Sequence, residues 1–375
     1  MRSNVSPWVG RAVGIVVVLL VVVASVFVWL HANRVRSDLL FPSPHAVGFD
    51  LEVISIGGGR VVLPRTSQTE RDGVWGLESD DAYAQVGEII RIDTEVERAL
   101  HTLIGSIEAG DAVRLDADAF PGDPKTAHGI GYEDVRVPGE LGPQPAWLIE
   151  GRRDTWVVFL HGEGVDRRAE SLRMVPVLVE EGFSVIVATY RNDLSAPASA
   201  DGMRRWGLDE WRDVEAAMLT ADRKGAEDFV LYAHGLGAEV ASMFLHESDL
   251  SGRVSAVVFD SPILDLEQLA ADHTSLISPL AEAGRTLAAI RFGIEWQYLD
   301  QIERAAAFDV PMLLMHGARD PVVPFSSSKA FADLRPDLVR LQRFERGEHG
   351  DLWNSSPQIY EDVVTGFLED THPEA

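Results

Sequence analysis

The chain has no cysteine among its 375 residues and few basic side chains for its number of acidic ones. The absence of cysteine excludes disulfide bonds, thiolate catalysis and zinc sites with cysteine ligands. The 33 lysine and arginine residues are outnumbered by 59 aspartate and glutamate residues, which gives a net charge of −26 at pH 7. Because nucleic acids attract cationic surfaces, we predict no nucleic-acid partner.

Charge is also absent from residues 12–30, which are mostly valine and leucine. About 20 apolar residues span the hydrocarbon core of a bilayer as a helix, so this run predicts a single-pass transmembrane anchor. A cleaved signal peptide is the alternative, but the run is long for one and no convincing small-residue cleavage site follows it. Two arginines precede the run, whereas the two that follow it are offset by Asp38. This bias predicts a cell-membrane protein whose globular part lies outside the cytoplasm.

The remaining chain divides by its hydrophobic pattern. Residues 1–11 are expected to form a tail, and residues 31–46, which include two prolines, a linker. Short strand-like runs around glycine turns predict a small β-rich domain over residues 47–120. From residue 130 to 370, buried strands alternate with helices, which indicates a mostly parallel sheet covered on both faces. A helix-rich insertion interrupts this α/β domain at about residues 262–308.

One stretch organises the α/β domain. An apolar strand runs through Ala233-His234-Gly235-Leu236-Gly237 directly into a helical pattern. This strand, sharp turn and helix resemble the nucleophile elbow of the α/β-hydrolase superfamily, whose pattern is G-x-S-x-G. Aligned with that pattern, Gly235 falls on the position of the nucleophilic serine. The resemblance therefore implies an α/β-hydrolase fold without its elbow nucleophile.

A second segment extends the resemblance to the oxyanion hole. The strand that ends at Leu160 is followed by His161-Gly162-Glu163-Gly164, which is similar to the loop that supplies one oxyanion donor in the family. By that resemblance, the donors here are the backbone N–H groups of Glu163 and Leu236. A plain turn after a strand is the structural alternative for this segment taken alone.

Two further segments resemble the rest of the family's catalytic triad. The run from His316 to Pro324 is similar to H-G-x-x-D-x-x-V-P, in which the aspartate, Asp320 here, orients the catalytic histidine. His349 follows the final strand with glycines nearby, as the family's general base does. The alternatives are a turn carboxylate and a solvated loop histidine. The resemblance covers roughly residues 130–370 and is closest to membrane-linked lysophospholipase-like and serine-peptidase-like hydrolases.

No cofactor and no metal site are predicted. His234 could be imagined as a metal ligand beside His349 and Asp320, but a histidine just before the elbow position commonly packs in this family. Among the hydroxyl groups nearby, Ser242 lies nearly two turns down the helix and Ser261 follows a different strand, so neither replaces the missing oxygen at Gly235.

These features predict a membrane-anchored protein that resembles ester or acyl hydrolases. Because glycine has no oxygen with which to form an acyl-enzyme, we expect it to be non-catalytic or weakly active. It would keep a pocket for a small acyl, ester or lipid-like ligand. One alternative is an active hydrolase in which His349, oriented by Asp320, activates water directly. The other is a structural envelope protein that uses the fold as a scaffold.

Overall fold

The computed structural model describes residues 7–41, 48–164, 167–272 and 278–373. Residues 1–6 of the expected tail and residues 42–47, at the end of the expected linker, lie outside this description. The chain forms two compact units, Met1–Phe41 with Asp265–Asp300, and Pro42–Leu264 with Gln301–Ala375. Each unit is described separately.

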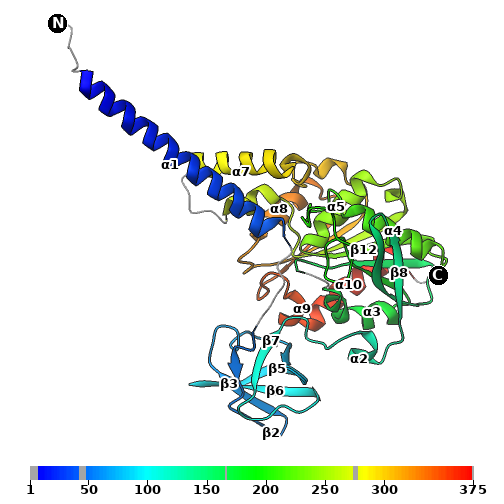
Figure 1. Ribbon diagram of the computed structural model, residues 1–375. Helices are drawn as coiled ribbons and strands as arrows, with labels where there is room; N and C mark the ends of the chain where they lie inside the picture. Colours follow the sequence, from blue (N-terminus) through cyan, green and yellow to red (C-terminus); the bar gives the residue numbers. More distant parts are fainter. Residues whose placement is uncertain (1–6, 42–47, 165–166, 273–277, 374–375) are drawn as a thin grey trace. The chain divides into compact units, whose positions relative to one another are not determined.

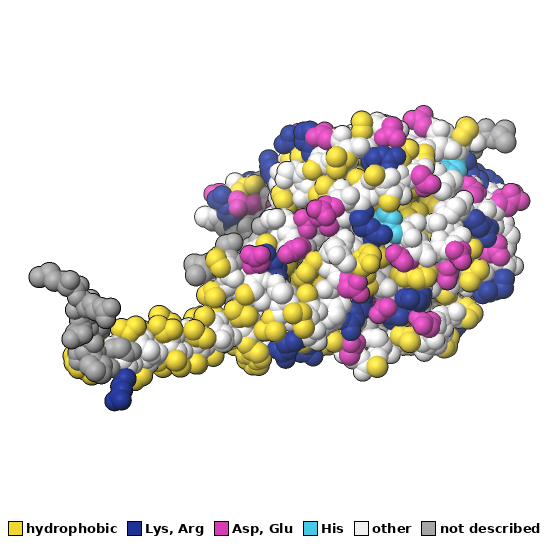
Figure 2. All heavy atoms as spheres, turned by 90° about the horizontal axis from the view of Figure 1, so that it is seen from above, with side chains coloured by type: hydrophobic (Ala, Val, Ile, Leu, Met, Phe, Trp, Pro, Cys, Tyr) yellow, Lys and Arg dark blue, Asp and Glu magenta, His cyan; other side chains and the backbone are white. Residues whose placement is uncertain are grey.

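The first unit is built on α1 (Pro7–Leu39), which contains the predicted apolar run. Residues Arg11–Leu39 are long and apolar enough to cross a membrane, and hydrophobic side chains cover their surface (Figure 2). The sequence predicted that the helix ends at residue 30, whereas it continues to Leu39. No proline or glycine interrupts this extension, and it buries one face that includes Ala32, Val35 and Leu39.

The helical insertion supplies the rest of this unit as α6 (Leu266–Asp272), α7 (Ser278–Phe292) and η3 (Trp296–Tyr298). Helix α7 lies along the C-terminal part of α1 (Figure 1). A side chain at Gly284 would collide with the imidazole of His31, so glycine permits the close approach. The insertion is therefore packed closely against α1.

The second unit begins with a sheet of seven antiparallel strands, ordered β1-β7-β4-β5-β6-β3-β2. Its core consists of side chains from one face, including Val61, Leu63, Trp75 and Leu77. The predicted β-rich region is present. The strands are β1 (Leu51–Glu52), β2 (Ser55–Gly57), β3 (Arg60–Pro64), β4 (Trp75–Glu78), β5 (Tyr83–Ile92), β6 (Glu95–Ile104) and β7 (Ala112–Asp116).

The α/β domain contains a second sheet of eight strands, ordered β15-β14-β13-β12-β10-β11-β9-β8. Neighbouring strands are parallel from β15 to β11, and β9 and β8 extend the other edge with antiparallel pairing. The predicted mostly parallel sheet is confirmed (Figure 1). The strands are β8 (Glu133–Gly139), β9 (Gly142–Ile149), β10 (Thr155–Leu160), β11 (Ser184–Ala188), β12 (Asp228–His234), β13 (Val254–Asp260), β14 (Met312–Gly317) and β15 (Val339–Phe344).

Helices connect these strands and cover the sheet. The helical segment after β10 is divided at Met174, with Pro176 in the first turn of its second part. The elements are α2 (Pro124–His128), η1 (Arg168–Arg173), α3 (Val175–Glu180), α4 (Trp211–Asp222), α5 (Leu236–Glu247), η2 (Ser251–Arg253), η4 (Ala305–Ala307), α8 (Phe325–Leu334), α9 (Leu352–Ser355) and α10 (Pro357–Thr371).

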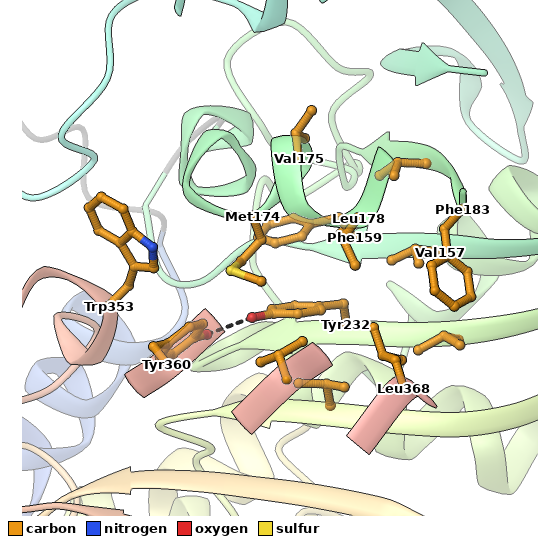
Figure 3. Close-up of a cluster of buried hydrophobic side chains, with 14 of the residues drawn as sticks. Val157, Phe159, Met174, Val175, Leu178, Phe183, Tyr232, Trp353, Tyr360 and Leu368 are labelled. Atoms are coloured by element: carbon orange, nitrogen blue, oxygen red, sulfur yellow. Dashed lines mark hydrogen bonds between the residues drawn. The ribbon is translucent and has the colours of Figure 1, made fainter. Parts of the chain in front are cut away.

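The core beside the central strands includes one buried polar link (Figure 3). Phe159 and Tyr232, from adjacent strands, stack with ring centroids 5.3 Å apart. The hydroxyl of Tyr232 lies 2.7 Å from that of Tyr360 on α10, which donates to Asp260 at 2.8 Å. This link ties the C-terminal helix to the ends of β12 and β13, because buried polar groups need hydrogen-bond partners.

Candidate functional site

The turn between β12 and α5 has the backbone that the sequence pattern predicted. Gly235 has φ 42° and ψ −110°, a left-handed conformation that disfavours residues with a side chain. Its N–H donates to the carbonyl of Asp260 at 2.9 Å, which fixes the turn against the neighbouring strand. A side chain at Gly237 would collide with the carbonyl of Leu160. The second glycine therefore lets the start of α5 lie against the end of β10.

Asp320 and His349 come together at the ends of two neighbouring strands. Oδ2 of Asp320 lies 2.8 Å from Nδ1 of His349. Oδ1 of Asp320 accepts two backbone N–H bonds, from Val322 and Val323, each at 2.8 Å. Although burial favours the neutral carboxyl, hydrogen bonds from His316 and His349 lower the pKa of Asp320 well below its usual range. Asp320 is therefore ionised and holds the imidazole by a charge-assisted bond.

The unexpected member of the site is the side chain of Glu163. A Cβ atom built on Gly235 would lie 2.6 Å from Oε2 of Glu163, so this carboxylate fills the space that a side chain at the elbow would need. The same oxygen is 3.7 Å from Nε2 of His349. The sequence pattern pointed only to the backbone N–H of Glu163. The available signal was the missing side chain at position 235, next to a loop that carries a glutamate.

The charge state of the imidazole follows from its two carboxylate neighbours. Burial opposes a charged His349, but contacts with Asp320 and Glu163 outweigh it and raise the pKa of His349 to about 10. Burial also favours a neutral Glu163, yet His349 lowers the pKa of Glu163 below its ordinary value. Near neutral pH the site therefore holds an imidazolium between two carboxylates, and this imidazolium is a proton donor rather than a base.

The expected oxyanion donors lie beside one another in the fold. Strands β10 and β12 are neighbours, with Leu160 paired to Ala233, so both loops leave the same edge of the sheet. Leu236 is the first residue of α5, where helix N–H groups have no partner within the helix. The N–H of Gly162 is instead occupied by Oε2 of Glu170 at 2.7 Å. The N–H groups of Glu163 and Leu236 remain our candidates.

The other histidines near the site have structural partners. Nε2 of His161 lies 2.8 Å from Asp193, and both side chains are buried. His316 contacts the hydroxyl of Ser328 at 2.7 Å and the carbonyl of Val323 at 2.9 Å. Burial lowers the pKa of His234. In the described ranges, no group of three or more histidine, aspartate or glutamate side chains is arranged to hold a metal ion.

Ser261, at the end of β13, is a feature whose role the sequence did not reveal. Its φ is 50°, one of four positive values among non-glycine residues in the described chain. Its hydroxyl donates to Asp260 at 2.7 Å and accepts from the N–H of Gly350 at 3.2 Å. Ser261 thus ties the end of β13 to the loop that carries His349.

Solved structures share this fold. The Pyrococcus furiosus esterase Pf2001 aligns with a TM-score of 0.54 at 20% identity, over 67% of this chain and 96% of the esterase. The chain therefore has the α/β-hydrolase fold. A Mycobacterium tuberculosis puromycin-hydrolyzing peptidase aligns with a TM-score of 0.51 at 17% identity, over 89% of this chain and 55% of the peptidase.

The chain is also similar in sequence to lysophosphatidylserine lipases. It is 24% identical to lysophosphatidylserine lipase ABHD12 of Danio rerio over 240 residues, which cover 58% of this chain and 59% of the lipase. The Rattus norvegicus lipase is likewise 24% identical, over 58% of this chain and 56% of the lipase. The chain thus spans less than two thirds of these relatives' length. A family described as a domain of unknown function (DUF8805) matches residues 52–116.

Proposed function

We propose that this α/β-hydrolase is a membrane-anchored binding protein for a small acyl, ester or lipid-like ligand, with little or no acyl-transfer activity. One observation carries the proposal. Gly235 adopts the elbow conformation without an oxygen, and the carboxylate of Glu163 fills the space beside it. The ligand class is supported by the lipase and esterase relatives.

The electrostatics of the site support the absence of an acyl-enzyme. A serine triad needs a neutral imidazole to take the proton of the nucleophile. His349, with a pKa of about 10, is instead protonated at neutral pH. This charge also counts against direct activation of water by His349, because the atom that would accept the proton already carries one.

A second candidate gives Glu163 a chemical role. Its carboxylate lies 3.7 Å from His349 and is ionised near neutral pH. In this candidate, Glu163 takes a proton from water while the water oxygen bonds to the acyl carbon. His349 then protonates the departing alkoxide, so the ester is hydrolysed without a covalent intermediate.

One assay separates these candidates. Full-length protein in detergent is incubated with a fluorophosphonate and, separately, with short-chain p-nitrophenyl esters. We expect no adduct and negligible turnover. Turnover without an adduct that disappears in Glu163→Gln would favour the second candidate. A stoichiometric adduct on any serine of the site, located by mass spectrometry, would contradict both.

We also propose that the α/β domain lies outside the cytoplasm, which rests on the arginine bias around the apolar run. The test uses Gly252→Cys, because Gly252 is exposed and a side chain there meets nothing within 4 Å. An impermeant maleimide should label intact cells that express this variant. The wild type has no cysteine and is the control that should remain unlabelled. Labelling only after lysis would reverse the proposed orientation.

A further inference from the structure

The β-rich domain contacts the loop that carries His349. We call residues 345–351 the histidine loop and residues 69–74, between β3 and β4, the strap. Arg71 of the strap pairs with Glu348 at 2.9 Å and with Asp351, so it grips the loop on both sides of His349. Asp351 also accepts the N–H of Glu348 at 2.6 Å, which closes the loop on itself.

A second contact lies just beyond the histidine loop, at the buried Asn354 of α9. Its backbone carbonyl accepts the N–H of Val74 at 2.9 Å. Its amide nitrogen donates to the carbonyls of Val74 at 2.8 Å and Ala117 at 2.7 Å. Gly73 has φ 102°, and a side chain there would collide with the carbonyl of Asn354. The strap therefore fits against α9 only with glycine at this position.

Arg98 of β6 fixes the path of the strap. Its side chain is fully buried, and its guanidinium donates to the carbonyls of Thr69, Arg71 and Gly73 at 3.1, 2.7 and 2.7 Å. Two further bonds reach the carbonyl of Gly87. Burial lowers the pKa of Arg98 to about 10, and Asp72 offsets part of this effect. A buried cation is costly, and its bonds to three strap carbonyls indicate that the strap is held in one conformation.

We propose that the β-rich domain is a positioning element of the site, which uses Arg98 and Arg71 to hold His349 between Asp320 and Glu163. The inference rests on the proposed function in taking His349 as the centre of the site. The contacts themselves require no turnover. Arg71 contacts the histidine loop and Arg98 contacts the strap, so both are positioning residues, and their loss should change the environment of the imidazole.

The test follows the titration of His349 by NMR in full-length, histidine-labelled protein in detergent. A His349→Gln spectrum assigns its signal among the 11 histidines. Asp320 and Glu163 are the titratable groups within ion-pair distance of the imidazole. Arg71→Ala should lower the pKa of His349 by about one unit or more, because a loosened loop lengthens its contacts with both carboxylates. Arg65→Ala is the control, since Arg65 pairs with Glu70 of the strap and otherwise donates to the carbonyl of Asp93 rather than to the histidine loop.

A second measurement keeps the proposal testable if Arg71→Ala folds poorly. Arg71→Lys retains the charge and should restore most of the His349 pKa. Hydrogen exchange over residues 345–356 should be faster in Arg71→Ala than in Arg65→Ala. A lower melting temperature with an unchanged His349 pKa and unchanged exchange would show a merely structural contact and overturn the proposal. A fluorophosphonate adduct on the wild type would contradict the proposed function without changing this titration.

Discussion

Two neighbouring strands, β12 and β13, each end in a turn that places a residue at positive φ, but the two residues differ in their chemistry. Gly235 has φ 42° and Ser261 has φ 50°, both in the left-handed region. Gly235 brings no side chain, and the carboxylate of Glu163 lies beside it. Ser261 has a hydroxyl, but this hydroxyl already donates a hydrogen bond to Asp260 and accepts one from the N–H of Gly350. The strained serine is therefore structural, whereas the unstrained glycine lies at the centre of the site.

The comparison teaches that a strained backbone does not by itself mark a nucleophile. A nucleophilic hydroxyl needs a neighbouring base that can receive its proton. The Ser261 hydroxyl donates to the buried carboxylate of Asp260 and accepts the backbone N–H of Gly350, and these two bonds hold it between β13 and the histidine loop. At Gly235 the imidazole is nearby, but there is no hydroxyl to activate.

The largest effect on activity should come from a double variant at the turn after β12. In it, Gly235 becomes serine and the neighbouring carboxylate of Glu163 is removed. We expect Gly235→Ser with Glu163→Ala to react with fluorophosphonates and to hydrolyse p-nitrophenyl esters orders of magnitude faster than the wild type. In a comparable triad, loss of the serine costs about 10⁶-fold in kcat. Removal of Glu163 should also lower the pKa of His349 and return it to its role as base.

The matched control adds His349→Ala to this double variant. Activity should fall back toward the wild-type level, since the serine then has no base. If the double variant folds but neither hydrolyses esters nor takes up the probe, the site is a binding site that cannot be returned to acyl transfer by these changes.

A smaller gain is expected from Gly235→Ser alone. Its Cβ would lie 2.6 Å from Oε2 of Glu163, so the glutamate must turn away before the serine can face His349. The left-handed turn should also cost about 1–3 kcal/mol with a side chain present. Ester turnover and the denaturation midpoint measure the two effects. A single variant as active as the double one would show that Glu163 does not obstruct the elbow.

The pH dependence of the free energy of unfolding tests the ion pairs of His349 with Asp320 and Glu163. The pKa of His349 is raised from 6.5 to about 10, so its stabilisation is complete below pH 6.5 and is lost as pH rises toward 10. In Glu163→Gln this loss should be smaller and should be complete at a lower pH, because the folded-state pKa of His349 falls when one of the two carboxylates becomes neutral. Urea unfolding at a series of pH values measures it. Parallel curves for the two proteins would rule out the contribution of Glu163.

The smallest effect is expected at Ser261. Ser261→Ala keeps the strained turn and loses both hydroxyl bonds, so it should lower the free energy of unfolding by about 1–3 kcal/mol. Ser261→Gly loses the same bonds but relieves the turn and should be milder. Neither change should affect probe uptake by the Gly235→Ser, Glu163→Ala protein. A loss of uptake without a loss of folding would mean that Ser261 takes part in the chemistry.

Continuous apolar runs made the α/β sheet predictable from sequence. The strands that became β10, β12 and β14 are almost fully buried, and each ends in small residues that mark a turn. The position of Glu163 was not predictable in the same way, because it depends on β10 and β12 being neighbours and on a void at Gly235. Arg71 joins the strap to Asp351 of the histidine loop, 280 residues further along the chain. Arg98 acts on that loop only through its bonds to the strap. A local sequence pattern does not predict contacts between residues so far apart in the chain.

The length of α1 has a consequence for the helical insertion. At 1.5 Å per residue, its 33 residues extend about 50 Å, whereas the hydrocarbon core of a bilayer is about 30 Å thick. A membrane that surrounds the apolar run therefore leaves the C-terminal third of α1 outside the hydrocarbon core. Helix α7 is attached to that third through Gly284 and His31. As the proposed anchor, α1 would set the height of the insertion above the lipid head groups, because a helix rather than a flexible linker joins the two.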